Sequence, residues 1–170
     1  MMASGQGERR SVLDAYHRRL TSDDPEVVKE AAWRWTKFAA GACFLLPDKE
    51  QIEQFINDPN GSFKGAILEC HYAANGCFLE WETQLLDGVD KIRHIPATII
   101  QGRYDLMCAP GNAWDLHKKW PEAELTFAPA DGHMGTEPGV LARFLDATDK
   151  YKKLFSKAET VCSKGSTKEA

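Results

Sequence analysis

Two side chains that could carry out acid–base chemistry, Asp105 and His133, each follow an apolar segment with the character of a β-strand. Asp105 comes shortly after residues 97–101 (ATIIQ), and His133 lies in the loop after residues 124–128 (ELTFA). A carboxylate bonded to one imidazole nitrogen fixes the tautomer and leaves the other nitrogen able to act as a base. The Asp-then-His order therefore predicts a catalytic pair, although an Asp in a turn also occurs for turn chemistry alone.

Both loops must lie at one edge of a sheet for these side chains to meet. Residues 97–101 are short, β-branched and nearly all apolar, as is typical of a strand buried on both faces of a parallel sheet. Between the two strands, Ala113, Leu116 and Trp120 lie on one helical face, and Pro121 ends that helix. The order strand, loop, helix, strand, loop favours parallel strands joined by a helical crossover, and ligands bind beyond the carboxyl ends of such strands.

A last amphipathic helix follows the second loop, and the residues beyond it have the composition of a frayed tail, residues 156–170. The helix is marked by apolar residues at helical spacing: Val140, Phe144, Ala147, Tyr151 and Leu154. Two strands alone do not make a stable sheet, so we expect the second half of the chain to be part of a larger fold.

The first half is predicted to be helical throughout. A short helix covers residues 12–20, and a clearer one begins where Asp24 can act as N-cap and Pro25 can occupy the first helical position. Further helices are expected around residues 51–56 and 63–72, separated by a turn at residues 57–61 (NDPNG). The aromatic residues of the second helix are expected to pack in a core rather than line a pocket: Trp33, Trp35 and Phe38.

Composition excludes several classes of function. With 43% hydrophobic and 27% charged residues, the composition is that of a globular protein. The net charge of −4 indicates no basic surface for binding nucleic acid or an anionic membrane. No apolar run is long enough for a membrane span, and the N-terminal residues lack the apolar segment of a signal peptide. The five cysteines are an odd number without paired spacing, which favours a reducing cytoplasm over a disulfide framework. The common zinc and P-loop motifs are missing, and neither a metal nor a cofactor is expected.

Residues 102–133 (GRYDLMCAPGNAWDLHKKWPEAELTFAPADGH) closely resemble the C-terminal part of the proline iminopeptidases, α/β-hydrolases that remove an N-terminal proline. Further segments resemble that family in the same order, so that the resemblance covers roughly residues 8–155. They are AYHRRL (15–20), DDPEVVKEAAWRW (23–35), FLLP (44–47), ILECHY (67–72) and IRHIPATIIQGRYD (92–105).

The resemblance implies roles for three residues. Asp105 corresponds to the triad aspartate and His133 to the triad histidine, while Glu69, in ILECHY, corresponds to a glutamate that binds the free α-amine of the substrate. A carboxylate facing an ammonium is a charge-assisted pair, which explains a requirement for a free N-terminus. The implied partner is thus a peptide or amino-acid amide with a free N-terminus. The implied fold class is α/β, with the C-terminal portion of an α/β-hydrolase at residues 89–155 and a helical cap at residues 11–88, preceded by a lead-in at residues 1–10.

The family's nucleophile is a serine in a G-x-S-x-G elbow upstream of the matched segments. None of the serines has the flanking glycines: Ser4, Ser11, Ser22, Ser62, Ser156, Ser163 and Ser166. Neither Cys108 nor Cys70 occupies a strand-to-helix elbow, so a cysteine nucleophile is disfavoured. We therefore expect that the chain by itself is not a competent hydrolase. The nucleophile is expected in an N-terminal half that complements this chain. The alternative protein partner is a second copy of the chain, in a homo-oligomer.

Two departures from the family affect the substrate pocket. The family's Trp-Glu pair in the cap, whose glutamate is a second amine ligand, is replaced by Phe38 and Ala39, and an aromatic pocket residue is replaced by Ala73. These departures do not support a strict specificity for proline. Two alternative functions also fit the sequence: a non-catalytic remnant that acts by binding, and an esterase-type α/β-hydrolase. The remaining histidines are expected to have packing roles: His17, His71, His94 and His117.

Overall fold

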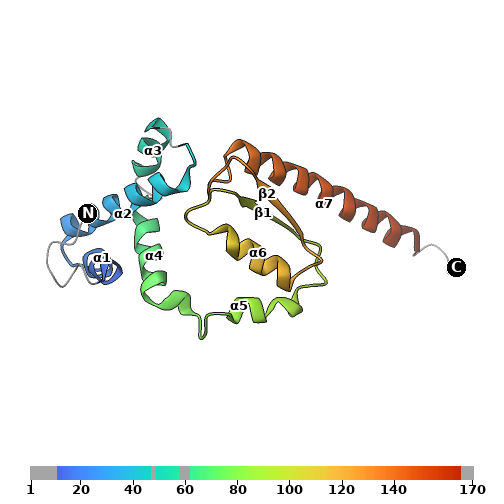
Figure 1. The fold of residues 1–170 in the computed structure, drawn as a ribbon, viewed down its shortest axis with the longest axis horizontal. Coiled ribbons are helices and arrows are strands. Elements are labelled where there is room, and N and C mark those ends of the chain that lie inside the picture. The colour runs from blue at the N-terminus through green and yellow to red at the C-terminus, as the bar shows by residue number, and fades with distance from the viewer. Residues whose placement is uncertain (1–10, 47–48, 58–61, 166–170) are drawn as a thin grey trace. The chain divides into compact units, whose positions relative to one another are not determined.

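A computed structural model of the chain describes residues 11–46, 49–57 and 62–165; for residues 62 and 157–165 only the backbone is considered. The chain divides into two compact units, one ending at Gly88 and the other beginning at Val89. Figure 1 shows the elements of both units. The predicted turn at residues 57–61 lies outside the described residues, except for Asn57.

The first unit is helical, as predicted. It contains α1 (Val12–Leu20), α2 (Pro25–Cys43), α3 (Lys49–Ile56), α4 (Ser62–Ala74), the 3-10 turn η1 (Gly76–Phe78) and the short α5 (Gln84–Asp87). The start of α2 confirms the predicted cap, because the Asp24 carboxylate accepts a hydrogen bond from the backbone N–H of Glu26 at 2.9 Å and Pro25 begins the helix.

Small residues form the core where α1, α2 and α4 meet. The buried residues are Leu20, Ala31, Ala32, Ala66 and Cys70, with the partly buried Leu13, Tyr16, Trp35, Phe63 and Ile67 packed around them. The expectation that Trp33 and Phe38 also pack in a core is wrong, since their exposed fractions are 46% and 77%. The buried face of α2 consists mainly of alanines, and these two aromatic side chains lie outside that face.

The second unit contains η2 (Val89–Lys91), β1 (Thr98–Gly102), α6 (Pro110–Lys119), β2 (Glu124–Ala128) and α7 (Pro138–Gly165). The strands are parallel and pair from Thr98 with Glu124 to Gly102 with Ala128, so both end at the same edge. Helices α6 and α7 pack on opposite sides of this pair (Figure 1). Val89, Trp120 and Ala123 form a core cluster in this unit, together with the partly buried Ala97, Ile99 and Leu116.

Two expectations for this unit need correction. Residues 98–101 are only partly buried rather than buried on both faces, because the sheet of the described residues has two strands and each strand has a neighbour on one side. The last helix continues to Gly165, so residues 156–165 are helical where a flexible tail was predicted. No helix among the described residues is both long enough and apolar enough to cross a membrane.

Candidate active site

The loops that follow β1 and β2 are joined by backbone contacts. The N–H of Arg103 donates to the carbonyl of Ala128 and the N–H of Tyr104 to the carbonyl of Asp131, both at 2.9 Å. Where the loops pass, Gly102 has no room for a side chain: a Cβ there would lie 1.8 Å from the carbonyl oxygen of Gly132. Glycine at position 102 thus permits the approach that brings the two loops together.

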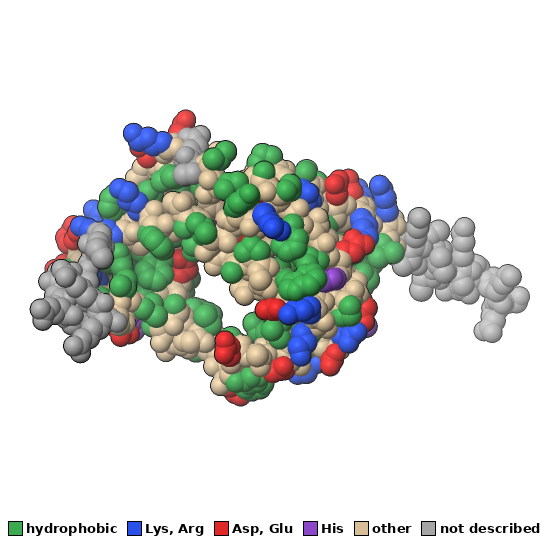
Figure 2. All heavy atoms as spheres, in the orientation of Figure 1, with side chains coloured by type: hydrophobic (Ala, Val, Ile, Leu, Met, Phe, Trp, Pro, Cys, Tyr) green, Lys and Arg blue, Asp and Glu red, His purple; other side chains and the backbone are tan. Residues whose placement is uncertain are grey.

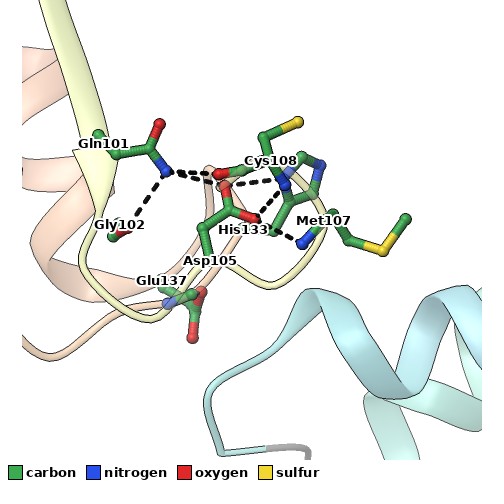
Figure 3. Close-up of polar contacts among 8 residues, drawn as sticks. Gln101, Gly102, Asp105, Met107, Cys108, His133 and Glu137 are labelled. Carbon is green, nitrogen blue, oxygen red and sulfur yellow. Dashed lines mark hydrogen bonds and ion pairs between the residues drawn. The ribbon is translucent and has the colours of Figure 1, made fainter. Parts of the chain in front are cut away.

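Asp105 is buried, with 7% of its surface exposed, and both of its carboxylate oxygens accept hydrogen bonds (Figure 3). Oδ1 accepts from the backbone N–H groups of Met107 at 2.9 Å and Cys108 at 2.8 Å. Oδ2 lies 3.0 Å from Nε2 of Gln101 and 3.1 Å from Nδ1 of His133. The carboxylate is therefore held by its own loop and directed at the imidazole.

The environment of Asp105 favours its charged form. Burial by itself raises the pKa of a carboxyl group, but here hydrogen bonds from the Cys108 backbone, His133 and Gln101 outweigh it. The pKa of Asp105 is consequently lowered from its ordinary value. Asp105 is thus a carboxylate at neutral pH, as is required of a group that accepts a hydrogen bond from an imidazole N–H.

His133 lies at the surface of the second unit with 36% of its side chain exposed. When Nδ1 donates its proton to Asp105, the neutral ring carries its acceptor lone pair on Nε2. Glu137 stabilises the loop that carries His133, because its Oε2 accepts a hydrogen bond from the N–H of Gly132 at 2.8 Å. The arrangement can accept a proton at Nε2 and stabilise the resulting imidazolium through Asp105.

Cys108 is near this pair but is poorly suited to be a nucleophile. Desolvation and the negative charge of Asp105 raise the pKa of the Cys108 thiol. A thiol with a raised pKa remains protonated at neutral pH, whereas nucleophilic attack requires the thiolate. The chemistry at Cys108 agrees with the sequence-based argument against a cysteine nucleophile.

Glu69 belongs to the first unit, where it lies exposed on α4. Its Oε2 accepts a hydrogen bond from the indole Nε1 of Trp35 at 2.8 Å, and the Trp35 ring packs edge-on against Tyr16 with a centroid distance of 5.3 Å. Of the two positions that depart from the family pattern, Ala39 is buried in α2 and Ala73 is exposed on α4. The other histidines of this unit, His17 and His71, stack on each other with a centroid distance of 6.3 Å.

Sequence reasoning missed several residues that shape these sites. Gln101 is the next-to-last residue of β1, and its Nε2 donates both to Asp105 and, at 3.1 Å, to the carbonyl of Cys108. The available signal was a polar residue near the end of an apolar strand. The role of Gly102 could not be predicted, since the carbonyl that it must avoid is distant in the sequence. Trp35 was interpreted as a core residue, although its indole N–H also binds Glu69.

Comparisons with known proteins agree with the resemblance. No protein-family model matches the chain. It is 46% identical over 145 residues to a proline iminopeptidase of Arabidopsis thaliana, matching 85% of this chain and 38% of that protein. It is 42% identical to a probable proline iminopeptidase of Leptolyngbya boryana and 41% identical to a proline iminopeptidase of Xylella fastidiosa, again over 85% of this chain. The matches cover 44% and 46% of those two proteins, so the chain spans less than half the length of these curated relatives.

The structure is similar to an esterase of Exiguobacterium antarcticum, with a TM-score of 0.50 at 21% sequence identity. The similarity covers 88% of this chain and 47% of the esterase, and at this identity it concerns the fold alone. The expected fold class is confirmed, because the mixed α/β structure with its small parallel sheet corresponds to part of an α/β-hydrolase. Over 85% of its own length, this chain is a homologue of the proline iminopeptidases.

Proposed function

We propose that this chain carries the acid and the base of a serine aminopeptidase of the proline iminopeptidase type. The observation that carries the proposal is the 3.1 Å contact between Oδ2 of Asp105 and Nδ1 of His133 at the ends of two neighbouring parallel strands. In this reading Asp105 orients the imidazole, and His133 takes a proton from a serine hydroxyl and later gives it to the leaving amine. The reaction is the release of proline, or of another N-terminal residue, from a peptide.

The serine comes from a segment that these 170 residues do not contain. Without it the covalent step has no nucleophile, and an aspartate and a histidine do not replace one. The chain alone is therefore proposed to be inactive, and a chain completed by the missing segment is proposed to be active. Two strands with partly buried residues and a row of exposed apolar side chains on α7 provide the surface for such a segment. Figure 2 shows hydrophobic side chains on the visible surface of the molecule among the charged ones.

Glu69 is proposed to bind the α-ammonium group of the substrate. Its carboxylate is exposed, and the hydrogen bond from Trp35 leaves the other oxygen, Oε1, as an acceptor for the substrate. Ala39 cannot act as the family's second amine ligand, and the exposed Ala73 replaces its pocket aromatic, so we propose that the preference for proline is relaxed. We further propose a cytoplasmic location, on the basis of the five cysteines in no paired arrangement.

The test compares the chain alone with a completed protein. The completing partner is the remainder of the Arabidopsis thaliana relative that this chain does not match, either fused or co-expressed. Hydrolysis of a prolyl arylamide and labelling by a serine-directed fluorophosphonate are measured for both. We expect the chain alone to be unlabelled and inactive, and the completed protein to be labelled and active.

Matched variants identify the roles within the completed protein. His133→Ala and Asp105→Asn should each lower kcat by roughly 10⁴-fold, which is the order of loss seen when a triad member is removed. His94→Ala and Asp115→Asn change an exposed histidine and an exposed aspartate of the same unit and should leave kcat within about twofold. Fluorophosphonate labelling of the chain alone, or full activity of His133→Ala, would overturn the proposal.

Substrate class is tested at Glu69. Glu69→Gln should raise KM for the prolyl arylamide and leave the hydrolysis of a simple ester unchanged, since an ester without an amine offers no ammonium to the carboxylate. Ester hydrolysis as the principal activity, insensitive to Glu69→Gln, would favour an esterase. A completed protein that binds the arylamide without turnover would favour a non-catalytic binding role.

A further inference from the structure

Asp105, Cys108 and His133 form a cluster that unites a carboxylate, a thiol and an imidazole. Each residue offers one ligand atom, and these atoms all lie within 4.8 Å of one another. Among the residues that the structure describes, this is the one group of three or more His, Cys, Asp or Glu side chains with that spacing. We propose that the cluster binds a thiophilic divalent cation, with Zn²⁺ as the best match to its ligands.

The donor types distinguish zinc from other biological cations. Thiolate, imidazole and carboxylate are the ligands of protein zinc sites, whereas Mg²⁺ and Ca²⁺ require mainly oxygen ligands. The Cys108 thiol, which is protonated in the free chain, would release its proton to solvent when the ion binds. Three protein ligands leave the fourth position of a tetrahedral zinc to water. The exposure of both Cys108 and His133 gives the ion and that water a route from solvent, while the third ligand, Asp105, is buried.

One pair of ligand atoms already has the separation that a tetrahedral ion requires. Nδ1 of His133 lies 3.1 Å from Oδ2 of Asp105, close to the roughly 3.3 Å that separates two ligand atoms each about 2.0 Å from a tetrahedral zinc. Sγ of the exposed Cys108 lies within 4.8 Å of a ligand atom of each of these two residues, and a change of its rotamer is proposed to complete the set. Carboxylate and thiol come from the same short loop, which is closed by the hydrogen bond from the Cys108 backbone N–H to Oδ1 of Asp105 at 2.8 Å.

A second layer of contacts holds these ligands in place. Asp105 receives hydrogen bonds from Gln101 and from the backbone of Met107, and the His133 loop is tied by the contact of Glu137 with the N–H of Gly132. Outer hydrogen bonds of this kind orient ligands and raise metal affinity. Figure 3 shows Gln101, Met107 and Cys108 arranged around the Asp105 carboxylate, with His133 beside it.

A bound zinc ion would also change the acid–base pair. Coordination through Nδ1 replaces the proton that His133 shares with Asp105, and coordination through Nε2 occupies the lone pair that accepts a proton. Either mode removes the imidazole as a base. Zinc is thus expected to inhibit the completed hydrolase reversibly, and this consequence rests on the proposed function, whereas metal binding itself does not.

The test uses Co²⁺ as a spectroscopic substitute for Zn²⁺ in the full 170-residue chain, under a phosphine reductant. We expect an ultraviolet thiolate-to-cobalt charge-transfer band and visible d–d bands of tetrahedral intensity, which saturate at one ion per chain and disappear when Zn²⁺ is added. Cys108→Ser should abolish the charge-transfer band, while Cys77→Ser, which changes an exposed cysteine of the first unit, should leave it intact. His133→Ala should weaken cobalt binding at least tenfold, and His94→Ala should not.

The outcomes separate this inference from the proposed function. Absence of the charge-transfer band in a folded chain, checked by near-ultraviolet circular dichroism, overturns the metal site, as does an unchanged spectrum in Cys108→Ser. A completed protein that hydrolyses the arylamide but is insensitive to zinc overturns only the inhibitory consequence. A cobalt spectrum in the chain, combined with an inactive completed protein, leaves the metal site standing and contradicts the proposed function.

Discussion

A Cβ on Gly102 would lie 1.8 Å from the carbonyl oxygen of Gly132, so these two backbones pass closer than a side chain at position 102 permits. The same Cβ would lie 2.9 Å from the carbonyl oxygen of Asp131. These contacts are between backbone atoms, which cannot rotate away as a flexible side chain does. The proximity of Asp105 and His133 therefore depends on a glycine that takes no part in the chemistry.

Gly102→Ala is expected to push the two loops apart. The free energy of unfolding should fall by about 2 kcal/mol or more, in the upper range for overpacked sites, measured by urea denaturation. Gly111→Ala is the matched control, because nothing lies within 4 Å of a Cβ at that helical position and alanine favours a helix by roughly 0.5–1 kcal/mol. Equal stability of Gly102→Ala and the unchanged chain would show that the loops are not in close contact.

Replacing the Asp105 carboxylate should change both the stability and its dependence on pH. Asp105→Asn puts an amide among the four donors that surround the carboxylate, and we expect it to destabilise the chain by about 2 kcal/mol at pH 7. Because the folded pKa of Asp105 lies below its unfolded value, the unfolded chain binds the proton more tightly. The contribution of the carboxylate is thus fully present above the unfolded pKa of about 4 and is lost as the pH falls through the folded pKa.

The measurement is the urea midpoint as a function of pH between neutrality and the acid range. The difference in urea midpoint between the unchanged chain and Asp105→Asn should become smaller as the pH falls below about 4. Asp115→Asn, on the exposed face of α6, should shift stability by no more than about 0.5 kcal/mol at any of these pH values. A difference that stays constant down to low pH would mean that the folded and unfolded pKa values of Asp105 are equal.

The alkylation of Cys108 should report the charge on its neighbour. The negative charge of Asp105 is one of the causes that raise the pKa of the Cys108 thiol, so Asp105→Asn should move the pH profile of its reaction with iodoacetamide to lower pH. The extent of modification is measured at the Cys108 peptide by mass spectrometry, with Asp115→Asn as the control. An unshifted profile would show that the carboxylate does not influence the thiol.

Trp35 is expected to position the carboxylate of Glu69. Trp35→Phe removes the indole N–H that donates to Oε2 but keeps an aromatic ring against Tyr16, and should lower the free energy of unfolding by about 1 kcal/mol. In the completed protein it should raise KM for the prolyl arylamide more than it lowers kcat. Trp33→Phe, at a position that is 46% exposed, is the control and should change neither the free energy of unfolding nor the KM. A fall in kcat with unchanged KM would contradict a role in binding the substrate amine.

Local patterns in the sequence were sufficient to predict most of the helices and strands. The capping residues Asp24 and Pro25 begin α2 as predicted, and β2 has the predicted bounds, because caps and apolar periodicity act between residues that are near in the chain. The Asp-then-His order after two strands predicted that the side chains would meet, and the parallel register makes both strands end at one edge.

Only the tertiary structure decided which side chains touch. Burial depends on neighbours that are distant in the sequence, so helical spacing could not show that Phe38 is exposed while Ala39 beside it is buried. The hydrogen bond between Trp35 and Glu69 and the close passage of Gly102 past Gly132 likewise join residues far apart along the chain. The sequence by itself determined that Asp105 and His133 follow two successive strand segments. The 3.1 Å contact between them, and the placement of Cys108 within reach of both, are properties of the folded loops.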